Sequence, residues 1–324
     1  MRTQDQVGAE TQGDNQDGNK AGNAGRYVLK GQPVVAPALA GGLHIVATPI
    51  GNLRDITLRA LEVLAAAQLI ACEDTRVTRR LLDHYGIVTP LTPYHDHNAA
   101  EARPRLLARL AQGDAVALVS DAGTPLVSDP GFKLVREAQE AGHPVTTLPG
   151  ASATLAALTL AGLPTDRFFF EGFLPTKETQ RRTRILELKR IPATIVLFES
   201  GPRLAAALAD LADTLGPRAA AVARELTKLH EEVQRGDLAT LAQHYAGDAE
   251  TRGEIVVVIA PPEPSETATD ASSLDALLRD ALARLSVKEA VGEIAAVTGR
   301  PRREVYQRAL ALSKTTAPND EAAR

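Results

Sequence analysis

From Leu43 onward the chain alternates short apolar runs with stretches of helical periodicity, and this alternation restricts the fold more than any other feature. The apolar runs are LHIVA (43–47), QLIAC (68–72), AVALVS (115–120) and PVTTL (144–148). Short strands separated by helices are typical of βαβ units, which build parallel sheets covered by helices. The sequence therefore predicts an α/β domain with a parallel sheet over residues 43–164.

A second set of apolar runs follows Gly162-Leu163-Pro164, where the alternation breaks. These runs are FFFE, TIVLFES, AAAVAREL, HEEVQRG and EIVVVIA. They are typical of strands and indicate a second, mixed sheet. We expect a second α/β domain over residues 165–261.

The two ends of the chain differ from its middle. The beginning is rich in Gly, Asn, Gln and Asp and lacks the basic start and apolar run of a secretory signal, so it predicts a polar tail. A Pro-, Ser- and Thr-rich stretch after Pro261 predicts a linker, and helical apolar spacing from Leu274 to Leu312 predicts three short helices. The expected segments are a disordered tail over 1–42, a linker over 262–271, a helical appendage over 272–314 and a tail over 315–324.

Composition excludes several classes of function. The 324 residues carry a net charge of -4, so any contact with nucleic acid requires local basic patches. The single cysteine, Cys72, and the seven histidines show no zinc-ligand spacing, and we expect no metal. No run of about 18 apolar residues is present, so we expect no membrane span. The single cysteine fits a reducing compartment, and we expect a cytoplasmic protein.

Three loops at expected strand ends carry the clearest chemical pattern. They are TPIGNL (48–53), SDAGTPLVSDPG (120–131) and PGASA (149–153). Ligands of open α/β sheets bind at the carboxyl ends of the strands, although neither G-x-G-x-x-G nor a P-loop pattern is present. Each loop also has a structural interpretation: a turn for the first, tight helix packing for the third, and a helix cap for Asp129, which we favour because Pro130 follows it.

Together with EGFLP (171–175), FES (198–200), AREL (223–226) and Gly253-Glu254, these loops resemble the tetrapyrrole-methylase superfamily of S-adenosylmethionine enzymes. The resemblance covers residues 43 to about 260. Longer stretches are similar to the branch that methylates ribosomal RNA of the small subunit: LHIVATPIGNLRDITLRALE, LIACEDTR, HDHN, LVSDAGTPLVSDPG, GFLPTK and ARELTKLHEE.

The resemblance implies a two-domain class III methyltransferase with a parallel-sheet N-terminal domain, a mixed-sheet second domain and a small helix-turn-helix-like appendage. It implies 2'-O-methylation of a cytidine in the decoding region of 16S ribosomal RNA, within the small subunit, by a homodimer that uses S-adenosyl-L-methionine. By motif, the cofactor-binding residues are Pro49, Gly51, Asp121, Gly123, Thr124, Pro125, Ala151, Ser152, Ala153, Leu197, Phe198, Ala223, Glu225 and Gly253.

A ribose hydroxyl is a weak nucleophile, so a general base is expected. Glu73 and Asp74 rank first as catalytic residues because they directly follow the second expected strand. The structural alternative is that Asp74 caps the next helix and that neighbouring arginines form surface pairs. Further candidates for the base are His95, Asp96, His97 and Glu199.

Contacts with RNA are expected from local positive charge. One basic stretch runs from Lys177 to Arg190 and a second lies between Arg300 and Arg308, and either could instead be a solvated basic face. The residues expected to contact RNA are Arg76, His95, His97, Lys177, Arg181, Arg182, Arg302 and Arg303.

Two other functions remain open from the sequence. One is a methyltransferase of the same superfamily that acts on a small molecule or a protein side chain. The other is an RNA-binding assembly factor that has lost the cofactor. The EDTR and HDHN stretches and the basic C-terminal region favour RNA methylation over the first, and the intact strand-end loops favour it over the second.

Overall fold

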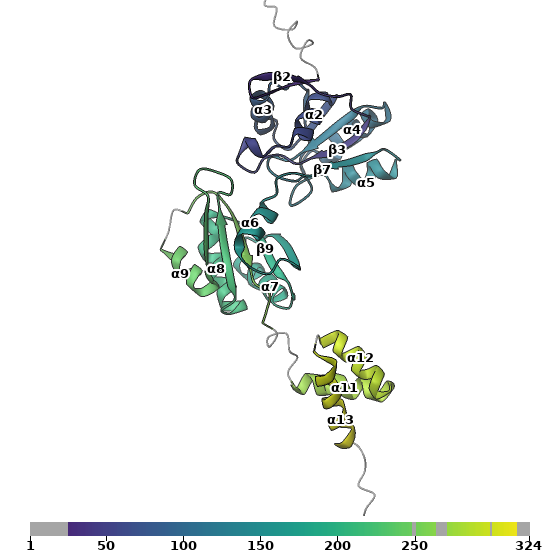
Figure 1. Cartoon of the computed structure of the whole chain (residues 1–324), viewed down its shortest axis with the longest axis vertical. Coiled ribbons are helices and arrows are strands. Elements are labelled where there is room, and N and C mark those ends of the chain that lie inside the picture. Colours follow the sequence, from purple (N-terminus) through teal and green to yellow (C-terminus); the bar gives the residue numbers. More distant parts are fainter. Residues whose placement is uncertain (1–24, 248–250, 264–270, 299, 316–324) are drawn as a thin grey trace, which may run out of the picture. The chain divides into compact units, whose positions relative to one another are not determined.

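A computed structural model describes residues 25–247, 251–263, 271–298 and 300–315. The chain divides into two compact units (Figure 1). The first contains the chain up to Ala157 together with Arg224–Glu232, and the second contains Leu158–Ala223 and the chain from Val233 onward. The expected linker overlaps residues 264–270, which lie outside the described residues, as do residues 1–24 and 316–324.

An antiparallel hairpin of β1 (Arg26–Leu29) and β2 (Gln32–Val35) lies inside the segment expected to be a disordered tail, so that expectation is wrong for these residues. Lys30 and Gly31 form its turn with φ of 52° and 77°, as two-residue hairpin turns require. Tyr27 is buried in the hydrophobic core of the first unit, and the burial of its ring explains why the hairpin is ordered.

The first unit has the expected parallel sheet, with strand order β5-β4-β6-β3-β7. Its strands are β3 (Gly42–Val46), β4 (Leu69–Cys72), β5 (Leu91–Pro93), β6 (Ala115–Val119) and β7 (Val145–Leu148). The helical segments between them are η1 (Leu53–Asp55), α2 (Leu58–Ala66), α3 (Thr75–His84), α4 (Ala99–Ala111) and α5 (Phe132–Glu140), and α6 (Ala153–Ala161) follows β7.

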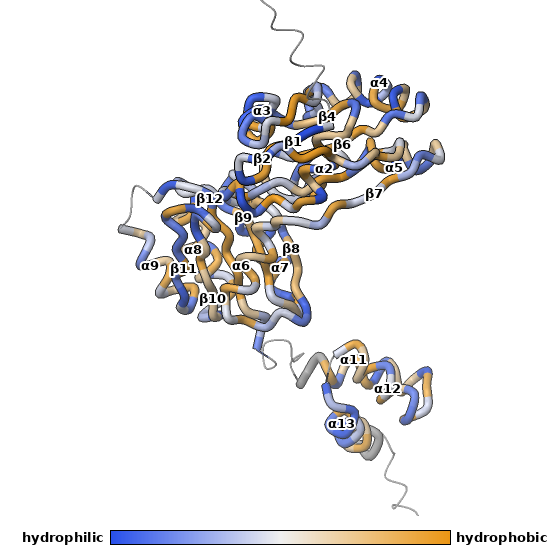
Figure 2. Tube along the Cα trace, turned by 45° about the horizontal axis from the view of Figure 1, so that its top comes forward, coloured by the Kyte–Doolittle hydropathy of each residue, from blue (hydrophilic) through white to orange (hydrophobic). Residues whose placement is uncertain are grey.

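The central strands β3 and β6 are buried at every position, as parallel strands covered by helices on both faces should be. Successive residues of β6 alternate between two cores: Ala117 and Val119 pack with α2 and α3, whereas Val116 and Leu118 pack with α4 and α5. Figure 2 shows these inner strands as largely apolar. All loops that follow the strands therefore emerge at one edge of a rigid sheet.

The second unit has a mixed sheet of order β11-β10-β12-β9-β8. Strand β8 runs parallel to β9, and β12 runs antiparallel to it. The strands are β8 (Phe168–Phe173), β9 (Thr194–Ser200), β10 (Ala219–Arg224), β11 (Glu232–Asp237) and β12 (Glu254–Ile259), and the helices are α7 (Glu178–Leu188), α8 (Gly201–Leu215) and α9 (Leu238–Ala246). The core between sheet and helices is built from leucine, isoleucine, valine and alanine side chains.

Three helices follow, as expected: α11 (Ala271–Arg284), α12 (Val287–Thr298) and α13 (Arg302–Thr315). They share a small core of their own that includes Leu278, Ile294 and Val305. Arg308 of α13 donates two hydrogen bonds of 2.6 Å to Asp275 of α11, which ties the first helix to the last. In the described part of the chain, no helix combines the length and apolar character needed to cross a membrane.

Candidate active site

The three strand-end loops of the first unit are joined by hydrogen bonds. Thr48 and Gly123 pair through two backbone bonds of 2.8 and 3.0 Å, and the Thr48 hydroxyl donates to the carbonyl of Ser120. The Thr124 hydroxyl donates to the carbonyl of Ala151 over 3.3 Å. These bonds bring the predicted cofactor-binding residues of all three loops together at the carboxyl edge of the sheet.

The loop after β6 has an unusual backbone. Leu126 and Ser128 are non-glycine residues with φ of 75° and 62°, and Gly123 and Gly131 also have positive φ. Such conformations cost free energy and persist where surrounding contacts enforce them, often at functional sites. At Gly131 a Cβ would lie 2.9 Å from Leu118 Cδ2, so both the backbone and the available space require glycine there.

Gly51, a predicted cofactor-binding residue, lies under the side chain of Lys228. A Cβ on Gly51 would lie 2.5 Å from Lys228 Cγ. The Lys228 ammonium donates a 2.7 Å hydrogen bond to Glu225, another predicted cofactor residue, and the turn holding both has positive φ at Glu225 and Thr227. Glu225 is thus ion-paired within a constrained turn, and Gly51 leaves room for the lysine stem.

Three carboxylates, which we call the strand-end carboxylates, lie on this edge: Glu73, Asp121 and Asp129. Burial raises the pKa of Glu73, and the negative charges of Asp121 and Asp96 raise it further. Burial also raises the pKa of Asp121, against a backbone hydrogen bond of 2.9 Å from Asp74 N–H that favours the charged form. None of the three forms an ion pair within the described residues.

For Asp129, the sequence-based prediction of a helix cap is wrong. The residue capping α5 is Gly131, which has no side-chain cap bond, so Asp129 does not cap the helix. Burial, reinforced by the charge of Glu73, raises the pKa of Asp129 to about 6, although a hydrogen bond with Ser120 opposes the shift. The run Asp-Pro-Gly resembles an ordinary cap, and the positive φ values that redirect the chain were not visible in it.

Asp74 caps helix α3, which is the structural alternative to a catalytic role. Its carboxylate accepts a 2.8 Å hydrogen bond from the Arg76 backbone at the start of α3 and forms a 2.6 Å ion pair with the Arg76 side chain. These bonds lower the pKa of Asp74 to about 2. A carboxylate so strongly stabilised as an anion is a poor proton acceptor, which leaves Glu73 as the better base.

The HDHN turn lies next to Glu73. His95 is close enough for its charge to lower the pKa of Glu73, and its ring is 6.0 Å from that of His97. Within the described residues, His95 Nδ1 is buried without a hydrogen-bond partner. The amide oxygen of Asn98 accepts from the His95 backbone over 2.8 Å and shapes the turn. His97 and Asp96 are exposed. No group of described residues has the arrangement of a metal site.

Among the second-unit cofactor candidates, Leu197 and Ala223 have buried side chains, so only their backbone atoms are available to a ligand. Leu197 belongs to the hydrophobic core. Phe198 is half-buried, and Gly253 has a φ of 99° just before β12. Pro49 and Pro125 are buried in the first unit, and Ser152 accepts a bond from Leu155 N–H at the start of α6.

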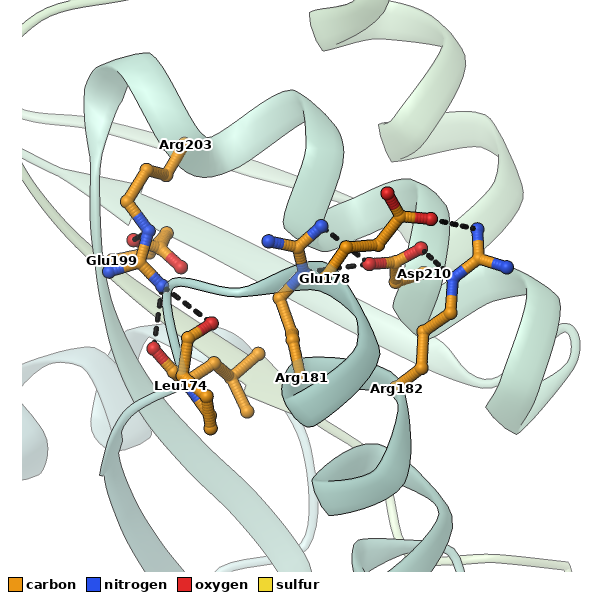
Figure 3. Close-up of polar contacts among 8 residues, drawn as sticks. Leu174, Glu178, Arg181, Arg182, Glu199, Arg203 and Asp210 are labelled. Carbon is orange, nitrogen blue, oxygen red and sulfur yellow. Dashed lines mark hydrogen bonds and ion pairs between the residues drawn. The ribbon is translucent and has the colours of Figure 1, made fainter.

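The basic stretch on α7 is mostly engaged in ion pairs, which Figure 3 shows in part. Arg181 is only 8% exposed and forms a 2.6 Å ion pair with the buried Asp210, so the expectation that Arg181 contacts RNA is wrong. Arg182 pairs with the same carboxylate over 2.8 Å but is half exposed. Arg184 forms two hydrogen bonds with Glu171. Sequence could not show this, because Asp210 lies 29 residues beyond Arg181.

Several of the other predicted RNA contacts are exposed. Arg76 is exposed beside its pair with Asp74, and Lys177 lies exposed at the start of α7. Arg302 and Arg303 are exposed on the first turn of α13, and no ion pair is recorded for them among residues 271–298 and 300–315. By contrast, Arg300 pairs with Glu304 and Arg308 with Asp275.

A parallel sheet with joined strand-end loops, followed by a mixed sheet, defines the two-domain methylase class. The family model for tetrapyrrole (corrin/porphyrin) methylases matches residues 42–242, and that for the RsmI C-terminal HTH domain matches residues 268–313. Among solved structures, diphthine synthase shares the fold with a TM-score of 0.53 and 21% identity, covering 67% of this chain and 89% of its own. The methyltransferase CobJ does so with a TM-score of 0.51 and 22% identity, covering 68% and 94%.

Comparison with curated relatives shows which group of this family the chain resembles. Ribosomal RNA small subunit methyltransferase I of Mesorhizobium japonicum is 52% identical over 288 residues, which is 89% of this chain and 97% of the relative. The protein of the same name from Pseudomonas aeruginosa is 48% identical over 84% of this chain and 97% of its own length. The chain belongs to the tetrapyrrole methylase family and, within it, to the ribosomal RNA small subunit methyltransferase I group.

Proposed function

We propose that this chain transfers a methyl group from S-adenosylmethionine to the ribose 2'-oxygen of a cytidine in the decoding region of 16S ribosomal RNA. The observation that carries the proposal is the set of strand-end carboxylates, which are half-buried and lack ion pairs in the described chain. The names of the relatives support small-subunit ribosomal RNA as the substrate. Exposed arginines on α13 support contact with phosphates.

The strand-end loops suit S-adenosylmethionine chemically. The cofactor carries an ammonium group and ribose hydroxyls, and the carboxylate of Asp121 can accept hydrogen bonds from them. Gly123 and Ala151 to Ala153 offer small side chains and backbone groups. The hydroxyl of Thr154, in the first turn of α6, is buried and has no hydrogen-bond partner within the described residues. When bound, the cofactor supplies an electrophilic methyl group on a sulfonium.

The work of the protein is to orient the ribose hydroxyl and to accept its proton. Positioning alone can contribute about 7–11 kcal/mol of the barrier. Glu73 is the proposed base: its carboxylate would accept the proton of the ribose hydroxyl as that oxygen receives the methyl group that the sulfonium would supply, with the neutral thioether as the leaving group. A raised pKa makes Glu73 a stronger proton acceptor than an ordinary carboxylate.

A transfer experiment tests this function. The protein is incubated with methyl-labelled S-adenosylmethionine and small ribosomal subunits that lack the modification, and the label is mapped to a nucleotide and an atom. Label on one cytidine 2'-oxygen is the expected result. Tight cofactor binding without transfer to subunits or to free 16S RNA would contradict the proposal and favour a small-molecule or protein substrate.

We also infer, from the family resemblance, that the chain acts in the cytoplasm as a homodimer. Sedimentation of the purified full chain measures the second point directly. A single species with twice the mass of one chain is expected, and a monomer at micromolar concentration would contradict it.

A further inference from the structure

Five of the six phenylalanines of the chain lie on two neighbouring strands of the second sheet. Phe168, Phe169, Phe170 and Phe173 are on the edge strand β8, and Phe198 is on β9. Phe168 is 44% exposed and Phe173 is 56% exposed. Exposed aromatic rings gathered at one place often mark a binding surface.

A β-bulge places three of these rings on the same face. The register of β8 against β9 shifts between Phe170 and Gly172, so Glu171 is the extra residue. Phe168 and Phe170 pair with Thr194 and Val196, and after the bulge Phe173 pairs with Phe198. Because alternate residues of β9 share a face, the odd-numbered Phe173 joins Phe168 and Phe170, whereas Phe169 packs on the core side.

The rings form a preorganised cluster, which we call the aromatic edge: Phe168, Phe170, Phe173 and Phe198. The Phe198 ring centroid is 5.0 Å from that of Phe170 and 5.6 Å from that of Phe173, with interplanar angles of 71° and 65°. Edge-to-face contacts of this kind stabilise aromatic pairs and fix their orientation. Phe173 is thus held in place while remaining accessible, and the exposed Phe168 lies on the same face of β8 two residues before Phe170.

The charges around the aromatic edge permit the binding of a polyanion. The bulge residue Glu171 is neutralised by Arg184 through bonds of 2.7 and 2.8 Å. Arg167 directly precedes β8 and Lys177 follows it, and both are exposed with no ion pair recorded in the described chain. Of the exposed acids nearby, Glu178 faces Arg182 at 3.3 Å and Asp166 lies beside Arg167 in sequence.

We propose that the aromatic edge binds unpaired bases of the RNA substrate by stacking on Phe168 and Phe173, with Arg167 and Lys177 contacting the adjoining phosphates. Single-stranded RNA is generally recognised by aromatic stacking combined with basic residues. A second copy of the chain fits less well, since a stable interface buries roughly 800 Å² per partner and two half-exposed rings offer about a quarter of that. This inference rests on the proposed RNA function.

The test measures the affinity of the full chain for 16S RNA at fixed salt, with Phe168→Ala, Phe173→Ala and Phe173→Trp. Each alanine variant should bind roughly 5- to 100-fold more weakly, and the tryptophan variant should bind like the wild type. Phe173→Leu keeps an apolar side chain without a ring and should lose affinity too. Phe132→Ala is the matched control, because Phe132 is 65% exposed on α5, far from β8 in sequence, and should not change RNA affinity.

The outcomes separate this inference from the function on which it rests. If wild-type protein methylates RNA and the Phe168 and Phe173 alanine variants bind RNA as tightly as it does, the inference is wrong and the proposed function stands. If these variants instead change the sedimentation coefficient while RNA affinity is retained, the aromatic edge is an interface between copies, which also overturns it. If the wild type neither binds nor methylates RNA, both proposals fail together.

Discussion

The buried carboxylates of the second unit and the half-buried strand-end carboxylates of the first unit differ in their partners. In the second unit each has an arginine within ion-pair distance: Arg181 and Arg182 for Asp210, Arg184 for Glu171 and Arg203 for Glu199. In the first unit, the strand-end carboxylates have no such partner in the described chain, and the pKa of each is raised. The carboxylates of the second unit thus hold arginines in place, whereas no such pair holds the strand-end carboxylates.

The arginine-paired carboxylates also fix loops. Arg203 pairs with Glu199 over 3.2 Å and donates a 2.6 Å hydrogen bond to the carbonyl of Leu174, which holds the GFLPTK loop to α8 (Figure 3). Carboxylates left without cations, by contrast, repel one another and cost folding free energy. This difference between the units predicts which substitutions affect turnover and which affect stability.

The largest expected effect is on turnover and concerns Glu73. Glu73→Gln keeps the shape of the side chain but cannot accept a proton, so the rate of methyl transfer should fall by about 10²–10⁴-fold. Cofactor affinity, measured by calorimetry, should stay within about twofold of the wild type. Asp74→Asn serves as the control, since asparagine also caps helices and should retain most of the activity. Full activity of Glu73→Gln would refute the assignment.

The next effect is on stability and concerns Asp210. Asp210→Ala leaves Arg181 buried without its partner, which should lower the free energy of unfolding by about 3–5 kcal/mol in urea denaturation. The matched control is Glu101→Ala, which removes an exposed pair with Arg105 at 2.7 Å and should cost under about 0.5 kcal/mol. Equal losses for the two variants would show that burial does not distinguish these ion pairs.

A smaller effect on stability is expected at Asp129, where substitution should stabilise the protein. Its pKa is about 6 in the folded protein against an ordinary value of 3.8 for an aspartate carboxyl, so the folded state binds this proton more tightly and is relatively destabilised at pH above 6. Asp129→Asn should therefore raise Tm by roughly 2–4 °C at pH 7.5, and the gain should shrink to nothing near pH 4. A gain that does not depend on pH would contradict the charge argument.

The smallest effect concerns the exposed arginines of α13. Arg302→Ala and Arg303→Ala should each reduce the slope of log affinity for RNA against log salt by about 1 and leave Tm unchanged. Arg308→Ala is the contrasting variant, because Arg308 is bound to Asp275, and it should lower the stability of the three-helix core instead. Identical salt slopes for all three variants and the wild type would exclude phosphate contacts here.

The sequence predicted the sheets and the strand-end loops because each depends on local periodicity or on short motifs. It missed features that depend on distant partners. Arg181 looked like a surface cation because nothing near it in sequence marks Asp210 as its partner. Asp129 looked like a helix cap because nothing in the sequence marks the positive φ of Leu126 and Ser128. The β1–β2 hairpin had a local signal, Lys30-Gly31 between apolar runs, that the polar composition before it obscured.

The most direct test of catalysis by unpaired carboxylates is the pH dependence of single-turnover methyl transfer at saturating cofactor and RNA. A base must be deprotonated to act, and burial together with the charges of Asp121 and Asp96 raises the pKa of Glu73 above its ordinary value. The wild-type rate should therefore fall about tenfold per pH unit below the apparent pKa, and Glu73→Gln should lose this dependence. A wild-type rate that stays constant as the pH is lowered from 8 to 4 would contradict the account.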